Sequence, residues 1–495
     1  MSGRIPWTLA PQEPRWLLLT GALALIASIL LLRAGTFLIL AAGAVLALAL
    51  AYARPFLAFL AYAGTLSLFQ AARLRFGESV VPLYFVDIFL GIALLGLFLR
   101  PKPLSPAPSR TPLDKLVLVL IVSVLPGFFL LFYRFPSAFQ ENLYFVIRYF
   151  LHMGAFFAAS RLITERSRLL VFLKLLYICI IVNGMWAIVQ SLPVLQPVGI
   201  PISDFLYGLV GIPYEHERPG LVIRAAAGFG SPNGLGGLLA MFLPLALFHP
   251  FPRASATARF LVPLVLFFGG LGFLLTFSRT AIAGFAAGLA VSSLALKNLG
   301  LLRGKAPLFI AGFALIAWAL TSVISPVGDV IVKRASGYAD PFEDTDFQAR
   351  VVGHYRFLGA VAEDPSLLLF GESLRLLELE RRSNIPPDTF KGFVSNSWLL
   401  VLLDSGLVAF VAYVLVYSRA VLLVWRRIAS ASRLDIDTSL LVGLLVAFVA
   451  LFFTHLVDNY MAFSIHMKGI YFAILGVAMA ELRLAQPVPR SSQSP

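Results

Sequence analysis

Long apolar segments alternate with short polar ones along almost the whole chain. Leu116–Tyr133, Phe260–Ser278 and Thr280–Leu296 each run without a charged residue. A hydrophobic segment of ~20 residues is long enough to cross a bilayer as a helix. The pattern therefore predicts an all-α fold, a polytopic transmembrane helix bundle of about 14 helices. The expected spans are residues 16–33, 36–53, 55–72, 83–99, 114–133, 144–160, 168–190, 233–249, 258–276, 279–297, 306–326, 396–418, 438–455 and 463–482.

Basic residues fall in every second connection between these spans. Positive charge is retained on the cytoplasmic side of a membrane, so these connections are assigned to the cytoplasm. An even number of spans then leaves both termini cytoplasmic. The residues concerned are Arg100, Lys102, Arg110, Arg161, Arg166, Arg168, Arg253, Arg259, Lys297, Arg303, Lys305, Arg419, Arg426, Arg427 and Arg433.

Composition supports a membrane protein and excludes several other classes. The 495 residues are 59% hydrophobic and 13% charged, with a mean hydropathy of +0.88, which rules out a soluble globule. The net charge of +14 follows from the topology and does not indicate nucleic-acid binding. The single cysteine, Cys179, excludes an intrachain disulfide, and the six histidines lack the spacing of a metal site. We expect no metal and no cofactor. Met1–Arg15 is polar and does not resemble a cleaved signal.

Two outer connections are too long to serve only as links. The first covers about 191–232. The second, about 327–395, is rich in charged residues and is expected to be a large, partly helical loop, with an amphipathic helix over 348–362. The chain is accordingly divided into N-terminal helices (1–190), helices with the first outer loop (191–326), the large loop (327–395), and C-terminal helices with a cytoplasmic tail (396–495).

The few charges inside the expected spans share one depth. Asp87, Arg148, Arg279, Asp404 and Lys468 all lie in the half assigned to the outer leaflet. A charge in hydrocarbon is expensive, and its default interpretation is a functional site. The alternative for single residues is snorkelling from the end of a span.

The first outer loop ends in Arg224-Ala-Ala-Ala-Gly-Phe-Gly-Ser-Pro-Asn-Gly-Leu-Gly. Ser231 or Asn233 is suited to cap the helix that follows. The positive end of that helix would face outward, close to Arg224, as an anion site. The alternative is an ordinary capped helix entry.

The next outer turn, Thr276-Phe-Ser-Arg-Thr280, is very short. Basic residues set membrane topology from cytoplasmic connections, so topology does not explain an arginine in an outer turn. Its guanidinium is suited to bidentate phosphate binding. We therefore favour a functional role for Arg279 over snorkelling. Gly284 and Gly288 form a GxxxG pattern, which we expect to let a neighbouring helix approach closely.

Further polar residues lie in and after the large loop. Arg350 and His354 share a face if the segment is helical. The loop ends in Ser395-Asn396-Ser-Trp398-Leu. Trp398 suits an interfacial aromatic belt, whereas Asp404, well inside the following span, does not.

Taken together, these stretches resemble the motifs of a known protein family. The chain resembles the O-antigen polymerase and ligase superfamily of bacterial membrane glycosyltransferases, which are GT-C-like proteins. The likeness rests on four stretches, in order: the Arg224 segment, Thr-Phe-Ser-Arg279-Thr-Ala, Arg350 followed by Glu-Asp-Pro-Ser-Leu-Leu-Leu-Phe-Gly371, and Ser-Asn396-Ser-Trp-Leu399 with Gly406-Leu. They cover about 225–410.

The resemblance implies roles for several residues. Arg224 and Arg279, with Arg350 as a further ligand, would bind the diphosphate of a polyprenyl-linked glycan, and the large loop would close over it. Two arginines on one diphosphate need guanidinium groups within about 10 Å of each other. Ligases of this family carry His-Asn-x-x-Leu at the loop end. Here Ser395 replaces the His while Asn396 is retained, which favours the polymerases.

The implied chemistry needs no metal. Polyprenyl diphosphate is a good leaving group, and two arginines can neutralise the charge that develops on it. One base must remove the proton of the incoming sugar hydroxyl. The candidates are His354, Glu372, Asp404 and His455.

The leading hypothesis is an enzyme of the bacterial inner membrane that polymerises polyprenyl-diphosphate-linked oligosaccharide repeat units at its outer, periplasmic face. Its partners would be the lipid-linked donor and acceptor, the bilayer and, in addition, a chain-length regulator. The nearest alternative is an O-antigen ligase acting on another acceptor. From another class, a lipid-linked sugar transporter or flippase is the alternative. Transporters show internal repeats and discontinuous helices at mid-membrane, which this sequence lacks.

Overall fold

The computed structural model describes residues 36–68, 73–74, 83–99, 110–134, 136, 139–191, 225–229, 231–252, 255–298, 362, 368–369, 371, 396–431, 435–457 and 465–485. For Arg279 and Asp404 only the backbone is described. Across this part the chain is helical, apart from a two-residue antiparallel pair of β1 (Arg73–Leu74) and β2 (Leu83–Tyr84). The expected all-α class is confirmed.

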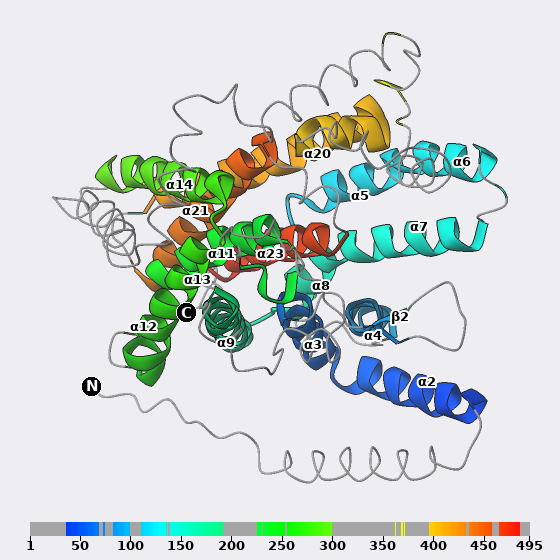
Figure 1. Ribbon diagram of the computed structural model, residues 1–495, viewed down its shortest axis with the longest axis horizontal. Helices are drawn as coiled ribbons and strands as arrows, with labels where there is room; N and C mark the ends of the chain where they lie inside the picture. The colour runs from blue at the N-terminus through cyan, green and yellow to red at the C-terminus, as the bar shows by residue number, and fades with distance from the viewer. Residues whose placement is uncertain are drawn as a thin grey trace, which may run out of the picture.

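The helices follow one another in chain order (Figure 1). They are α2 (Thr36–Ala53), α3 (Pro55–Leu68), α4 (Phe85–Leu99), α5 (Asp114–Ser123), α6 (Leu125–Arg134), α7 (Phe139–Met153), α8 (Ala155–Leu162), α9 (Arg166–Ser191), the 3-10 turn η3 (Ala227–Phe229), α11 (Pro232–Leu247), the π-helix η4 (Thr257–Leu261), α12 (Val262–Leu264), the π-helix η5 (Val265–Gly269), α13 (Gly270–Leu275), α14 (Arg279–Asn298), α20 (Ser397–Ala429), α21 (Ile436–Val457) and α23 (Ile465–Leu484).

Five helices in the described part are long and apolar enough to cross a membrane. α2 and α3 add a sixth if Val45–Ala53 and Pro55–Leu68 form one span bent by 110°. The chain is thus consistent with a multi-pass membrane protein, but the expected count of about 14 spans is not supported. The five helices are Leu143–Leu162, Arg166–Gln190, Thr257–Leu275, Ser405–Ala429 and Asp437–Leu456.

Part of the difference is geometric, because some of the expected spans are short or broken in the described part of the chain. Phe85–Leu99 and Pro232–Leu247 are apolar helices of 15 and 16 residues. At 1.5 Å per residue, a helix of this kind reaches ~15–25 Å, less than the ~30 Å hydrocarbon core. The expected span 114–133 is divided between α5 and α6. The expected spans 16–33 and 306–326 and the expected helix 348–362 lie outside the described residues, apart from Ala362.

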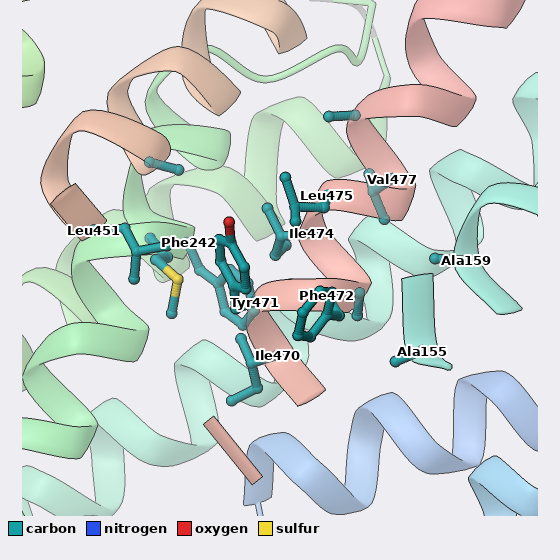
Figure 2. Packing of buried hydrophobic residues seen from close by; sticks show 14 of the residues in the cluster. Ala155, Ala159, Phe242, Leu451, Ile470, Tyr471, Phe472, Ile474, Leu475 and Val477 are labelled. Carbon is teal, nitrogen blue, oxygen red and sulfur yellow. The ribbon is translucent and has the colours of Figure 1, made fainter. Parts of the chain in front are cut away.

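α23 lies in the middle of the bundle, with α8 on one side and α11 and α21 on the other (Figure 1). Figure 2 shows its apolar side chains between these helices, with Ala155 and Ala159 of α8 opposite them. Gly476 allows the contact, because a Cβ there would lie 2.5 Å from the Phe156 carbonyl oxygen. Small residues therefore set the separation of these two helices, as is common in membrane bundles.

The GxxxG pattern of α14 packs against α21, as the sequence predicted. A Cβ at Gly284 would meet the Ala450 carbonyl oxygen at 2.6 Å, and one at Gly288 would meet that of Val446 at 2.6 Å. Since residue numbers rise along α14 as they fall along α21, the two helices are antiparallel. The first turn of α14 therefore lies beside the last turns of α21.

Basic side chains join several helix termini at one end of the bundle, which we call the basic end. Arg166, at the start of α9, pairs with Asp437 at the start of α21 (2.7 Å) and with buried Glu481 near the end of α23. Arg161 pairs with Asp114 at 2.8 Å, and Arg483 donates to the Ile163 carbonyl at 2.7 Å. Arg427 of α20 donates to the Ala485 carbonyl. The connections that the sequence assigned to one side of the membrane thus meet in space.

The close contact of α14 with α21 predicts a strong effect of one added methyl group. Gly288→Ala should lower the free energy of unfolding by about 1–3 kcal/mol, because the Val446 backbone has to move. The matched control is Gly91→Ala in α4, where a Cβ meets nothing within 4 Å. Alanine there should be neutral or stabilising, since it favours helix. Thermal or denaturant unfolding in detergent measures both. Equal stabilities for the two variants would contradict the packing.

Candidate functional site

Two of the motif stretches meet at a pair of turns, which we call the paired-turn junction (residues 225–229 and 276–278). The backbone N–H of Ala225 donates to the Leu275 carbonyl oxygen at 3.0 Å. Gly236, in the first turns of α11, lies directly against the second turn, because a Cβ there would be 2.9 Å from the Ser278 Cβ. The segment after Arg224 and the segment before Arg279 are therefore in direct contact.

The junction holds backbone in an unfavourable conformation. Ala227 has φ 45° and Phe277 has φ 48°, and they are the non-glycine residues with positive φ in the described part of the chain. Left-handed backbone is costly for residues with a Cβ and persists where surrounding contacts enforce it, most often at functional sites. Both strained residues belong to one small region, one in each turn.

Side-chain oxygens hold the two turns in place. The Gln190 Oε1 accepts hydrogen bonds from the N–H groups of Ala226 (3.1 Å) and Ala227 (2.8 Å). In the second turn, the Thr276 hydroxyl donates to the Phe273 carbonyl (2.7 Å) and accepts from the Ser278 N–H (3.2 Å). Thr276 and Ser278 are buried. The turns are thus supported from within the protein.

Two helices begin at the junction. α11 starts at Pro232, with Ser231 in the N-cap position as expected, although its side chain makes no capping hydrogen bond. α14 starts at Arg279. Helix N-termini carry partial positive charge and unpaired N–H groups, so two that begin at one place favour a bound anion.

The junction is far from the basic end. α9 begins at Arg166 in the basic end and reaches the junction through Gln190, which places the two ~36 Å apart along the helix. The antiparallel contact of α14 with α21 likewise brings Arg279 toward the last turns of α21. We call this side the junction end.

Two of the five intramembrane charges, Asp87 and Arg148, form a buried ion pair, and a third, Lys468, lies over an aromatic ring. The Arg148 Nε lies 2.6 Å from the Asp87 Oδ2, and the His152 Nε2 lies 2.9 Å from the Asp87 Oδ1. The Tyr144 hydroxyl donates to Asp87 at 3.2 Å. The Lys468 Nζ lies 4.0 Å from the centre of the Tyr149 ring, next to Arg148 in the sequence. The unfavourable free energy of burying these charges is offset by their close partners.

A second buried polar group surrounds His455, one of the candidate bases. Its Nδ1 lies 2.7 Å from the Leu451 carbonyl oxygen, which can only accept, so Nδ1 carries the proton. The Tyr413 hydroxyl then donates to Nε2 at 3.0 Å. Both ring nitrogens are engaged, so His455 does not face a substrate directly in this arrangement.

The His455 group borders a small cavity and supports the start of α20. The volume of the cavity is about 20 Å³, which is enough for one water molecule. Ser405, Lys468 and Tyr471 also line it. The Trp398 ring packs on His455 and on Tyr413, at 5.5 and 5.4 Å between ring centres.

The other predicted site residues are placed as follows. The Asn396 Oδ1 caps α20, accepting from the N–H groups of Trp398 (2.9 Å) and Leu399 (3.2 Å). The Asp404 backbone lies in the second turn of α20, just before the kink at Gly406 (φ 77°). Arg224, Arg350, His354, Glu372 and Ser395 lie outside the described residues. Within the described part, no three His, Cys, Asp or Glu side chains gather to hold a metal.

Sequence reasoning missed Gln190 and His152. Neither belongs to a recognised motif. Gln190 is the last residue of an expected span, and that position alone gave no indication of two backbone partners. The signal for His152 was its place one turn after Arg148 on the same helix face.

The apolar helices are consistent with a multi-pass membrane protein, and the structure adds a strained, polar junction at one end of the bundle. No protein-family model matches the chain, and no curated protein matches it.

The role of Gln190 gives a test of the junction. Gln190→Leu should lower the free energy of unfolding by about 1–3 kcal/mol, because it leaves the Ala226 and Ala227 N–H groups without their acceptor. Ser430→Ala is the control, since this exposed hydroxyl at the end of α20 should contribute within about 0.5 kcal/mol. Unfolding in detergent measures both variants. A Gln190→Leu protein as stable as the control would show that the junction does not depend on this side chain.

Proposed function

We propose that this protein is a glycosyltransferase of the bacterial inner membrane that polymerises oligosaccharide repeat units carried on polyprenyl diphosphate, at the outer face. The observation that carries the proposal is the hydrogen-bonded contact between the Arg224 segment and the Arg279 turn. A shared diphosphate site requires these two segments to be neighbours, although 55 positions separate the arginines in the sequence.

The junction suits a diphosphate for electrostatic reasons. Two helices begin there, and each presents N–H groups and a positive dipole end. Arginine adds a full charge and a planar fork that binds phosphate oxygens in pairs. Donors held in place before the reaction stabilise charge that develops in the transition state. The strain at Ala227 and Phe277 fits such a preorganised site.

The proposed reaction is a displacement at the anomeric carbon of the donor. A sugar hydroxyl of one lipid-linked glycan attacks that carbon while its bond to the diphosphate oxygen breaks. Polyprenyl diphosphate leaves with the electron pair, and the arginines neutralise its charge. A base takes the hydroxyl proton, and His354, Glu372 and Asp404 stay the candidates. His455, engaged on both nitrogens, instead supports Trp398 and the loop end at Asn396.

Arginine-to-lysine variants test this function. Arg279→Lys and Arg224→Lys should each reduce polymerisation by roughly a hundredfold, the scale of losing one charge-stabilising donor. Lysine keeps the charge but loses the fork. Arg259→Lys, at an exposed arginine of η4, is the matched control and should retain full activity.

The measurement is mass spectrometry of lipid-linked products formed by purified protein in nanodiscs from a repeat-unit donor. Polymerase activity gives multiples of the repeat unit still attached to polyprenyl diphosphate. Single transfers onto a non-polyprenyl acceptor would identify a ligase. Movement of unchanged donor between leaflets would identify a flippase and exclude the proposed reaction.

A further inference from the structure

Four basic side chains gather in one part of the basic end, where the start of α5, the end of α8 and the last turn of α23 meet. We call them the α5 basic cluster: Arg110, Lys115, Arg161 and Arg483. Arg161 pairs with Asp114, the first residue of α5, at 2.8 Å. Arg483 donates to the carbonyl oxygen of Ile163, two residues after Arg161. Arg110 and Lys115 lie on either side of Asp114 in the chain, and both are exposed.

The cluster has more positive than negative charge. Arg161 is the member that pairs with a carboxylate, that of Asp114. Arg483 donates to a neutral carbonyl oxygen, and its Nη1 has no hydrogen-bond partner in the described part of the chain. Within the same part, Arg110 and Lys115 form no ion pair. Uncompensated charge at the edge of hydrocarbon is unfavourable, so the cluster favours an anion from outside the protein.

The exposed face of α5 continues from this charge into apolar residues. Leu118, Val119 and Val122 are 55%, 51% and 54% exposed. With Lys115 they recur at intervals of three and four residues, which places them on one face of the helix. Val122 lies ~10 Å from Lys115 along the helix axis. We call these three residues the α5 stripe. The face thus has a cation at the basic end and hydrocarbon side chains beyond it.

This order of groups matches a phospholipid better than a soluble anion. A phospholipid holds its phosphate at the surface of the bilayer, and its acyl chains run inward from there. A free phosphate or a nucleotide would use the basic cluster and leave the apolar stripe without a role. A headgroup with a net negative charge is favoured, because basic residues near the membrane surface attract acidic lipids. A zwitterionic headgroup carries its own ammonium group beside the phosphate.

The cluster is separate from the paired-turn junction. The basic end and the junction are ~36 Å apart along α9, which exceeds the ~30 Å thickness of the hydrocarbon core. The two ends therefore belong to opposite faces of a bilayer. A lipid at the α5 basic cluster is thus a different molecule from any ligand of the junction, and the inference goes beyond the proposed function without depending on it.

We propose that the α5 basic cluster binds the phosphate group of an acidic phospholipid, and that an acyl chain of this lipid lies along the α5 stripe. The Arg161 side chain remains 36% exposed while it pairs with Asp114, so its guanidinium also has room for phosphate oxygens. Lys115 and Arg110 add exposed positive charge beside it. The lipid supplies the negative charge that the described residues around the cluster lack.

Lipid binding to the purified full-length protein tests the headgroup preference. Native mass spectrometry in detergent gives the Kd of the first bound lipid for acidic phosphatidylglycerol and for zwitterionic phosphatidylcholine. We expect phosphatidylglycerol to bind at least tenfold more tightly. Arg110→Gln combined with Lys115→Gln should reduce its affinity about tenfold or more, because each cation near the surface contributes roughly fivefold. The affinity for phosphatidylcholine should stay unchanged.

Arg259→Gln is the matched control, because it removes an exposed positive charge of η4 outside the cluster. Its affinity for phosphatidylglycerol should stay within twofold of the original. An equal loss in the control and in the double variant would show attraction to overall charge and reject a site. Equal binding of the two lipids by the unchanged protein would also overturn the proposal.

Photo-crosslinking tests the location of the acyl chain. A benzophenone amino acid replaces Val119, or Val171 of α9, which is 45% exposed. Both positions are the sixth residue of their helices, and the basic residues near Val171, Arg166 and Arg168, are paired with carboxylates. In nanodiscs with equal amounts of the two phospholipids, we expect at least fivefold more phosphatidylglycerol than phosphatidylcholine adduct at Val119, and equal amounts at Val171.

Other results at Val119 would overturn the proposal. Equal amounts of the two lipid adducts would make the stripe ordinary lipid-facing surface. A crosslink within the chain would show that another segment covers the stripe, and a crosslinked dimer would show a second copy.

A competition experiment separates the lipid from a soluble phosphate. Glycerol 3-phosphate carries the phosphate group without acyl chains, so a hundredfold excess should leave the bound phosphatidylglycerol in place. Displacement at that or a lower excess would assign the cluster to soluble phosphate compounds and reject the lipid site.

Discussion

A lipid bilayer offers no hydrogen-bond partners, so every polar group within it must find one inside the protein. This constraint accounts for several polar contacts inside the described bundle. The Asn183 amide donates to the carbonyls of Ser67 (2.6 Å) and Cys179 (2.9 Å), and the Tyr177 hydroxyl donates to the Leu245 carbonyl. Each contact joins backbone groups of separate turns or helices. Polar side chains therefore help to fix how the helices pack.

The same constraint accounts for the close approach of helices at glycine. Lipid chains are as apolar as leucine side chains, so helix association depends on tight packing and hydrogen bonds. Gly184 shows this at the α9–η5 contact, where a Cβ would lie 2.2 Å from the Phe268 carbonyl oxygen. The π-helical turns on either side of Val262–Leu264 lie at this contact, next to the segment that leads into the junction. The close contact between α9 and η5 is therefore adjacent to the segment that leads into the paired-turn junction.

The sequence predicted the helical class and some contacts, because these depend on local pattern. The spacing of Gly284 and Gly288 predicted a close helix contact. Asp87 and Arg148 were identified as intramembrane charges, but their pairing with each other depends on the fold. The number of spans was not predictable in the same way. Apolar composition continues through breaks such as the one at Val124, which divides the expected span 114–133 between α5 and α6.

The candidate site was predictable only in part. The motifs identified the two turns, but their hydrogen-bonded contact depends on the fold between them. Gln190 carries no motif, and its two backbone partners lie 36 and 37 positions away. His455 was identified as a candidate base because it is a histidine within a span. Its two hydrogen bonds, which give it a supporting role, come from packing against Tyr413 and from its own helix.

The central claim is that the Arg224 and Arg279 segments form one anion site, and cysteine cross-linking tests it most directly. Arg224→Cys and Arg279→Cys are combined in a Cys179→Ser protein and treated with a short bismaleimide. If the two segments form one site, we expect an efficient crosslink within the chain. A pair at Ala225 and Leu275, whose backbones are hydrogen-bonded, is the positive control. Crosslinking of the control pair alone would contradict the account.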